Sequence, residues 1–457
     1  MKRILSFLLV LVMLLSVMGC QSNTPASSDA SGAASVSGDS SAPASDKPEL
    51  QLWALPLGPA ETYGPAIQKV LDKYNSEDHS ATVKLEVLSW SGFIEQFQTA
   101  IAAGTPPDIT FATYYDVAKY VAADEAIDLT DIVTKWEEEK NPILDDFLPG
   151  TLELGKFGDS YYALPFSTEG KTIYYRASIL EDELGFTDLD KEVTWDKLLE
   201  ICAAVKEKYG EEGMYALGFF TLDMGSTNAM LNLLVSNAAS WVNAEGTGPA
   251  YDDPKVMEVM EFVGKMYENG CFPDGMVSYN QYDLEKLYDS GKLAMVWKSN
   301  FSHAKANEEI YNDTKLMGPI VGPSADKARG NMWMNGAMGF KNAGHEEEVK
   351  EFLAWLIDGE LLPILTEGGA SMIPLCNSLY EDEFYKTDWM QSQYAKFKDY
   401  YVDLSWPAAA PPVATGPIFN QNLLGMPLEA LLMGSTDYAG DLNKAQEAMA
   451  VVFKEYE

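Results

Sequence analysis

Between residues 50 and 111, segments with strand-like spacing of apolar residues take turns with segments of helical spacing. This order limits the fold more than any other feature of the chain. Residues 50–52 and 83–87 alternate apolar and polar side chains, whereas 66–74 and 93–101 repeat apolar side chains at helical intervals. A short apolar run at 109–111 closes the series. Period two is typical of strands and a period of about 3.6 is typical of helices, so the predicted order is β-α-β-α-β. This order indicates a parallel sheet covered by helices, that is, an α/β lobe.

The chain is too long for one such lobe. It has 457 residues, and single hydrophobic cores stop growing at roughly 250–300 residues. We therefore expect at least two lobes. Later helical repeats predict further helices at 194–210, 254–266, 349–357 and 442–453.

The first 20 residues have the pattern of an export signal. Two basic residues precede an almost wholly apolar stretch, 4–15, which is too short to be a comfortable membrane span. Gly19 and Cys20 end the segment in a pattern that resembles the lipobox of bacterial lipoproteins, with Met18 where a smaller residue is usual. The resemblance implies that Cys20 is lipidated after cleavage. The alternative is an ordinary signal peptide that ends near a cysteine.

The next segment, 21–48, consists largely of Ser, Ala, Gly, Asp, Thr and Pro. Such a composition cannot bury enough apolar surface to offset the entropy lost on ordering. We expect a disordered tether that holds a folded body on the extracellular face of the cell membrane, anchored through Cys20.

Charge and cysteine content limit the partners. The chain carries 69 acidic and 32 basic residues, a formal net charge of −37, which argues against nucleic acid and anionic lipid as partners. Cys202, Cys271 and Cys376 are too widely spaced for a metal-binding knuckle. They are either buried free thiols or one disulfide with a spare thiol. We expect no metal ion and no cofactor.

One segment has a specific pattern: Phe97-Gln-Thr-Ala-Ile-Ala-Ala-Gly-Thr-Pro-Pro-Asp-Ile109. Gly104 supplies a left-handed helix C-cap, the prolines prevent continuation of the helix, and Asp108 can accept hydrogen bonds from backbone amides in the turn. The pattern resembles the signature of the family 1 extracellular solute-binding proteins, which serve ABC importers of sugars and include the maltose-binding proteins. Further segments match in the same order: Tyr162–Pro165 with Ile173–Tyr175, Gly291–Met295, and Glu348–Leu356.

The resemblance implies a type II periplasmic-binding-protein-like fold, with two discontinuous α/β lobes joined by a multi-strand hinge. We expect one lobe from 49–164 with 335–372, and the other from 165–334 with 373–457. The strands that cross between them are expected near 163–166, 332–339 and 371–375. By the same resemblance, the protein is expected to capture a carbohydrate, with an oligosaccharide favoured, as a monomer, and to deliver it to the permease subunits of an ABC importer when the lobes close.

Sugars present flat CH faces that stack on aromatic rings, and hydroxyl groups that need polar partners. Ligands of open α/β sheets bind beyond the carboxyl ends of the strands. Aromatic residues follow the first three predicted strands at Trp53, Trp90 and Tyr114, with Tyr115 as the alternative to Tyr114. For each of them the other possibility is a place in the core.

Further candidates lie in the second half of the chain. In the family that the chain resembles, one strand of the second lobe carries an aromatic residue that stacks on the ligand. The matching position here is Phe301, and Trp297 is the alternative for this role. The remaining candidates lie at the predicted crossings or in a proline-rich loop: Glu169, Trp333, Asn335 and Trp406.

Two other functions are the alternatives. A secreted carbohydrate-degrading enzyme would use a pair of carboxylates, but the three histidines have no metal-site spacing and no Gly-x-Ser-x-Gly elbow is present. The sequence therefore favours a binding protein over an enzyme. A cationic solute such as a polyamine would need an acidic aromatic cage, for which Glu169 and Asp116 are the candidates.

Overall fold

The computed structural model describes residues 47–55, 57–58, 61–88, 93–222, 224–298, 307–341, 344–368, 373–387, 396 and 398–456. The predicted signal segment with Cys20, all but the last two residues of the predicted tether, Trp90 and Phe301 lie outside these ranges. Within them, no helix has both the length and the apolar character needed to cross a membrane.

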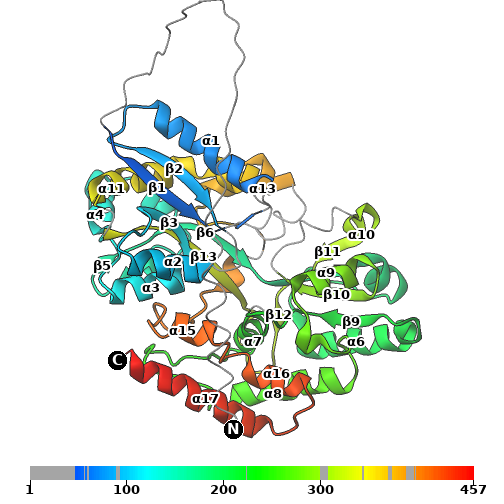
Figure 1. Cartoon of the computed structure of the whole chain (residues 1–457). Coiled ribbons are helices and arrows are strands. Elements are labelled where there is room, and N and C mark those ends of the chain that lie inside the picture. The colour runs from blue at the N-terminus through cyan, green and yellow to red at the C-terminus, as the bar shows by residue number, and fades with distance from the viewer. Residues whose placement is uncertain are drawn as a thin grey trace, which may run out of the picture. The chain divides into compact units, whose positions relative to one another are not determined.

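The predicted N-terminal series forms as expected. The strands are β1 (Glu49–Ala54), β2 (Thr82–Val87) and β3 (Ile109–Thr113), with α1 (Tyr63–Ser76) and α2 (Phe93–Ala102) between them. β1 pairs in parallel with β2 on one side and β3 on the other. The two connections therefore run in opposite directions across the sheet, and right-handed crossovers place α1 and α2 on opposite faces, as Figure 1 shows.

Later strands complete this first sheet, whose order is β14-β6-β13-β3-β1-β2. β13 (Gly330–Gly339) runs antiparallel to both β3 and β6 (Leu164–Gly170), and β14 (Ile373–Pro374) runs antiparallel to β6. β15 (Tyr401–Val402) pairs with the start of β13. β13 thus runs antiparallel to the β-α-β-α-β unit, and β6, on the far side of β13, runs in the same direction as that unit.

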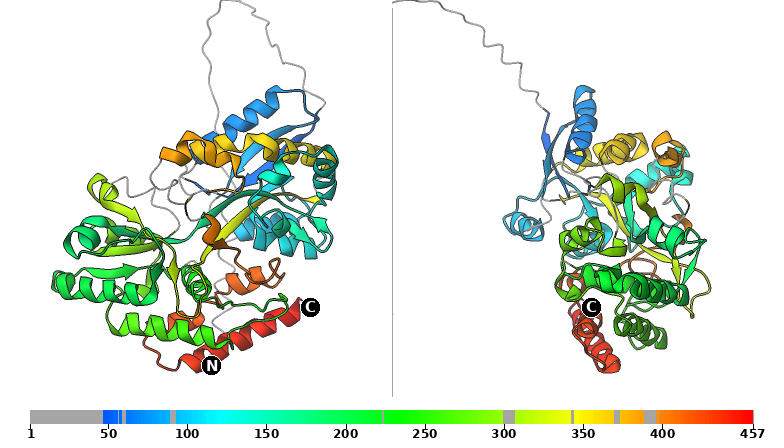
Figure 2. Two further views of the ribbon diagram at one scale, coloured as in Figure 1. Left: turned by 180° about the vertical axis from the view of Figure 1, so that it is seen from behind. Right: turned by 90° about the vertical axis from the view of Figure 1, so that its right-hand side faces the viewer.

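A single residue, Lys171, separates β6 from β7 (Thr172–Arg176), so the chain passes directly from the first sheet into a second one. The second sheet has the order β11-β7-β10-β9. β9 (Tyr215–Gly218) and β10 (Leu293–Lys298) are parallel, whereas β7 is antiparallel to β10 and to β11 (Thr314–Leu316). β6 and β13 link the two lobes, as the front and back views show (Figures 1 and 2).

The remaining elements cover these sheets. In the first lobe they are α3 (Tyr114–Ala122), α4 (Thr130–Glu139), α5 (Ile143–Asp146), β4 (Lys156–Phe157), β5 (Ser160–Tyr161), α11 (Glu346–Trp355), α12 (Leu362–Gly368) and α13 (Glu383–Thr387). In the second they are β8 (Val193–Thr194), α6 (Trp195–Tyr209), α7 (Gly225–Ser236), α8 (Pro254–Glu268), α9 (Gln281–Asp289), α10 (Glu308–Asp313), β12 (Ile320–Val321), α15 (Thr415–Asn420), α16 (Met426–Leu432) and α17 (Tyr438–Glu455).

Two large hydrophobic cores divide the body into two lobes. One contains buried side chains from 50–166 and 334–385, and the other contains buried side chains from 173–333 and 404–453, together with Tyr115. A smaller cluster lies around Tyr174 and Tyr288 in the second sheet. The two-lobed α/β fold expected from the sequence is therefore confirmed.

Local signals behave as physical chemistry predicts. Gly104 has a φ of 70° and follows α2, and the Thr194 side chain caps α6 by accepting a hydrogen bond from the Lys197 amide. Asp108 acts over a longer range than expected, because its Oδ2 accepts from the Gln51 amide of β1 at 2.7 Å. The aspartate thus ties the turn before β3 to the neighbouring strand.

The hinge contains a close contact of backbone and ring. Tyr401 lies over Gly170 at the end of β6 and over Gly330 at the start of β13. A Cβ added to Gly170 would lie 2.5 Å from Cζ of Tyr401, and one added to Gly330 would lie 2.9 Å from the same ring. Only glycine lets the two crossing strands approach this ring.

Candidate functional site

Two adjoining clefts lie where the crossing strands meet the second sheet. Both are lined by Lys171, Asn232 and Trp297. Lys171 joins β6 to β7, Asn232 lies on α7, and Trp297 is the penultimate residue of β10. The clefts therefore lie beyond the carboxyl ends of the parallel strands β9 and β10, which is where open α/β sheets bind ligands. We call these two clefts, together with Trp333 of β13, the crossing site.

Trp333 lies beside the clefts, next to Lys171, which lines both of them. Its ring meets Tyr115 edge-on with centroids 5.5 Å apart, and the ring of Phe419 lies 5.8 Å away. The ring is 8% exposed, and its indole nitrogen is buried with no hydrogen-bond partner among the described residues. A buried donor without a partner is costly, so this nitrogen would gain from an acceptor on a ligand, since the described residues supply none.

A charged pair lies beside this ring. Glu169 stands opposite Trp333 in the pairing of β6 with β13. The Lys171 ammonium lies 3.4 Å from Glu169 Oε2 and 5.9 Å from the centroid of the Trp333 ring. Both charged side chains are mostly buried, at 12% and 16% exposure. Two residues selected from the sequence, Glu169 and Trp333, are thus brought together by strand register.

Asparagines on α7 form the polar side of the crossing site. Asn232 uses both ends of its amide: Nδ2 donates to the Asn228 carbonyl at 2.9 Å, and Oδ1 accepts from the Asn331 amide at 3.2 Å. Asn228 Nδ2 donates to the Met224 carbonyl at 3.0 Å. Asn228 Oδ1 is buried and has no partner among the described residues. Because Asn228 lines one of the clefts, this oxygen can accept a hydrogen bond from a ligand hydroxyl.

A buried ion pair underlies the same cleft. Lys298, which ends β10, donates to Glu285 Oε1 of α9 at 2.5 Å, and the two side chains are 2% and 9% exposed. Burial lowers the pKa of Lys298 to about 8, although Glu285 acts in the opposite direction. The charge of Lys298 is thus balanced by the carboxylate of Glu285.

Trp406, which was also selected from the sequence, packs on a residue that lines the other cleft. The guanidinium of Arg329, a lining residue, lies 4.8 Å from the centroid of the Trp406 ring and 2.7 Å from Asp326 Oδ1. Ser240 donates to the Trp406 carbonyl at 2.7 Å. Trp406 is half-buried and reaches the crossing site through this arginine.

The charges of the crossing site are balanced. Its three cations, Lys171, Lys298 and Arg329, each have a carboxylate partner. Among the residues that the structure describes, no aspartate or glutamate lines either cleft. An ion-paired lining of amides, aromatic rings and neutralised cations suits a polar but uncharged ligand.

Three other sequence-selected residues lie in different surroundings. Trp53 is half-buried at the end of β1 and packs edge-on against Phe97 of α2 at 5.2 Å. Tyr114 is 2% exposed in the core of the first lobe, and Tyr115 is the neighbour that contacts Trp333. Asn335 is 1% exposed. Its Nδ2 donates to the Ser167 hydroxyl across the β13–β6 pair at 3.3 Å, within the first sheet.

Sequence reasoning missed part of the crossing site. It did not select Lys171, Asn228, Asn232 or Arg329, and it gave Trp297 only as an alternative to Phe301. The position of these residues was the available signal. Lys171 follows the first predicted crossing, and Asn232 interrupts the apolar run 229–235, four residues after Asn228.

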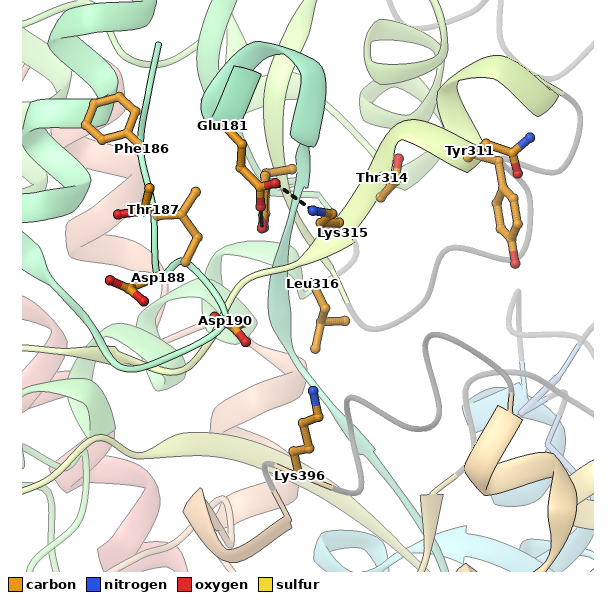
Figure 3. Close-up of a pocket in the computed structure, with 13 residues that line it drawn as sticks. Glu181, Phe186, Thr187, Asp188, Asp190, Tyr311, Thr314, Lys315, Leu316 and Lys396 are labelled. Atoms are coloured by element: carbon orange, nitrogen blue, oxygen red, sulfur yellow. Dashed lines mark hydrogen bonds and ion pairs between the residues drawn. The ribbon is translucent and has the colours of Figure 1, made fainter. Parts of the chain in front are cut away.

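A cavity of about 700 Å³ lies elsewhere, along the edge strand β11. The Glu181–Lys315 ion pair, drawn as a dashed line in Figure 3, lies within it, and Asp188 and Asp190 line it as well. The cavity runs beside an edge strand and contains no tryptophan among its described lining residues. We therefore take the crossing site, at the carboxyl ends of the strands, as the functional candidate.

No metal centre is present in the part of the chain that the structure describes. No group of three or more His, Cys, Asp and Glu side chains is close enough there to hold an ion.

Comparison with known sequences gives one family. The sequence profile of the bacterial extracellular solute-binding proteins matches residues 58–359. A protein of Brucella abortus named as a binding protein is 24% identical over 295 residues, which cover 64% of this chain and 68% of that protein. A lactose-binding protein of Rhizobium radiobacter is 24% identical over 188 residues, 40% of each chain.

Comparison with solved structures gives the same fold. A sugar transporter from Arthrobacter chlorophenolicus with bound laminaribiose has a TM-score of 0.73 and 19% identity, over 90% of this chain and 99% of that one. Maltose-bound MalE3 of T. maritima has a TM-score of 0.71 and 17% identity, over 88% and 99%. The cyclic α-maltosyl-1,6-maltose binding protein of Arthrobacter globiformis has a TM-score of 0.71 and 16% identity, over 90% and 100%.

Proposed function

The chain belongs to the bacterial extracellular solute-binding proteins, and we propose that it captures an oligosaccharide and delivers it to an ABC importer. Structures of the same fold hold laminaribiose and maltose, which supports a sugar as the ligand. The lobes close around the sugar, and the closed complex docks on the permease subunits of the importer. The protein binds its ligand without altering it.

One observation carries this proposal: a buried ring and two unused buried hydrogen-bonding atoms occur together at the crossing site. Trp333 supplies the ring and an indole donor, and Asn228 Oδ1 supplies an acceptor. Sugars need both kinds of contact, because their CH faces stack on rings and their hydroxyls both donate and accept. A ligand hydroxyl would satisfy groups that the described protein leaves without partners.

The charges favour a neutral sugar over a polyamine. Glu169 already pairs with Lys171, and Asp116, the other acid considered for a cationic cage, pairs with Lys119 at 3.5 Å. Recruiting either carboxylate for a polyamine would require breaking a partly buried ion pair, which leaves a lysine uncompensated. The crossing site offers a neutral ligand its hydrogen bonds without that cost.

Three of the remaining sequence-selected residues complete the proposed binding surface: Trp53 contributes from the first lobe, and Trp297 and Trp406 contribute from the second. Tyr114 and Asn335, which are 2% and 1% exposed within the first lobe, are assigned to its core and not to the binding surface. Trp90 and Phe301, outside the described residues, are retained as proposed contacts. We also retain the two discontinuous lobes, with the boundaries given above except that 373–387 join the first lobe, whose core contains Leu375, Cys376 and Tyr385. Lipidation of Cys20 is retained as the proposed anchor at the extracellular face of the membrane.

The test is a panel of purified oligosaccharides and polyamines added to the protein, with thermal unfolding and product analysis on each sample. The expected result is a higher unfolding temperature with one or a few neutral oligosaccharides, and unchanged sugar after incubation. Stabilisation by a polyamine alone would contradict the proposed ligand class. Release of shorter sugars would contradict the proposal that the protein only binds.

A further inference from the structure

Two of the cysteines meet in the core of the second lobe. Cys202 lies on α6, and Cys271 follows α8, with exposures of 1% and 0%. Both side chains belong to the same hydrophobic cluster. The Cys202 thiol interacts directly with the Cys271 thiol, and this interaction is the largest influence on its ionisation. The two sulfur atoms are therefore neighbours although the residues are far apart in sequence.

Strand β9 holds the pair in place. The Cys271 carbonyl accepts hydrogen bonds from the Ala216 and Leu217 amides of β9 at 3.1 and 3.0 Å. Helix α6, which carries Cys202, packs against the same strand. The backbone on both sides of the thiol pair is thus fixed by regular structure, so the two thiols meet whenever the second lobe is folded.

The third cysteine of the body provides an internal comparison. Cys376 is buried in the core of the first lobe, where its backbone bridges to Phe147. Burial raises the pKa of its thiol to about 12. All three thiols are free in this structure.

We propose that Cys202 and Cys271 form a disulfide bond when the chain folds outside the cytoplasm, and that Cys376 stays reduced. The oxidant is an external disulfide, either a small-molecule disulfide or that of an oxidase. The first thiolate attacks this disulfide, forms a mixed disulfide and releases one thiol, and the second thiolate then attacks the mixed disulfide and releases the other. Two protons leave the cysteines, and two electrons reduce the external disulfide to two thiols.

The bond should form during folding and not in the finished lobe. The thiolate is the attacking species, and contact with Cys271 together with burial raises the pKa of Cys202. A disulfide reagent also has no route to a pair that is at most 1% exposed. Once formed, the bond would link α6 to the end of α8 and close a loop of about 70 residues, which restricts the unfolded chain and stabilises the lobe.

The experiment uses the full chain with Cys20→Ser, so that only three thiols remain. The protein is unfolded with a reductant, refolded in a buffer of reduced and oxidised glutathione, and then unfolded again in iodoacetamide. Mass spectrometry should find one alkylated cysteine, Cys376, in this sample and three after reduction. Peptide mapping should recover a linked peptide containing Cys202 and Cys271.

Matched variants assign the bond. Cys376→Ser should leave no alkylated cysteine, whereas Cys202→Ser should leave two. The oxidised protein should also unfold at a higher temperature than the same protein kept reduced, and native reduced protein should react slowly with glutathione disulfide. Three alkylated cysteines after oxidative refolding, or a linked peptide that contains Cys376, would overturn the proposal. The linked peptide decides the question even if a serine variant fails to fold.

Discussion

Replacing Asn228 by alanine should weaken the affinity for sugar without lowering the stability of the free protein. In the free protein, Asn228 Oδ1 is a buried acceptor without a partner among the described residues. Burying such a group costs about 1–3 kcal/mol, and its removal relieves that cost. The variant also loses the bond from Nδ2 to the Met224 carbonyl, worth about 0.5–1.5 kcal/mol. Alanine is in addition the better helix former. We therefore expect an unfolding temperature in the absence of ligand that is unchanged or slightly higher.

Affinity should fall in the same variant, because a sugar hydroxyl loses its acceptor. A neutral hydrogen bond of about 0.5–1.5 kcal/mol corresponds to a roughly 2- to 13-fold weaker Kd. The assay is isothermal titration with the sugar identified in the panel. Asn443→Ala is the matched control, because Asn443 is an exposed helical asparagine on α17 that, within the described part of the chain, donates to Glu447 alone. Unchanged affinity in Asn228→Ala, together with a clear loss of stability, would refute the assigned role of this amide.

Three further outcomes are expected. Folding lowers the pKa of Lys298 from 10.5 to about 8. Between these two pH values the unfolded chain keeps the lysine proton and the folded protein does not, so the free energy of unfolding should rise with pH. Burial of the charged lysine costs about 3 kcal/mol of folding stability below pH 8, and this cost should disappear by about pH 10.5. Denaturant unfolding should show this gain relative to Lys298→Met/Glu285→Gln, and parallel curves would contradict it. Gly170→Ala should destabilise the protein by about 1–3 kcal/mol through the clash with Tyr401. In Gly210→Ala the new Cβ would have its nearest neighbour at 3.6 Å, so unfolding should hardly change, and equal losses in the two variants would argue against the clash. Sugar affinity should vary less than about 2-fold between low and moderate salt, since a neutral ligand is insensitive to screening, whereas a steep dependence would indicate a charged ligand.

The elements that the sequence predicts best are those determined by neighbouring residues. The β-α-β-α-β series forms because its apolar spacing is local, and Thr194 caps α6 because the residues that it serves lie within one turn. Gly104 adopts the left-handed conformation that the end of α2 requires. Such features depend little on the rest of the fold, so a pattern in the sequence is sufficient to predict them.

The crossing site depends on contacts that no local pattern encodes. Tyr114 and Tyr115 are adjacent at the start of α3, and only the position of the second lobe makes Tyr115 the contact of Trp333. Glu169 meets Trp333 through the register of β6 with β13, which joins strands from distant parts of the chain. The role of Asn232 likewise depends on the distant amide of Asn331. Aromatic residues at strand ends could be predicted as candidates, but their partners could not.

Small-angle X-ray scattering with and without ligand tests lobe closure most directly. The chain has two separate cores joined by crossing strands, so a sugar bound between the lobes should favour one arrangement of the lobes over the others. At saturating concentration of a sugar that raises the unfolding temperature, the radius of gyration should fall. An unchanged radius of gyration at saturation would contradict capture by closure of the two lobes around the ligand.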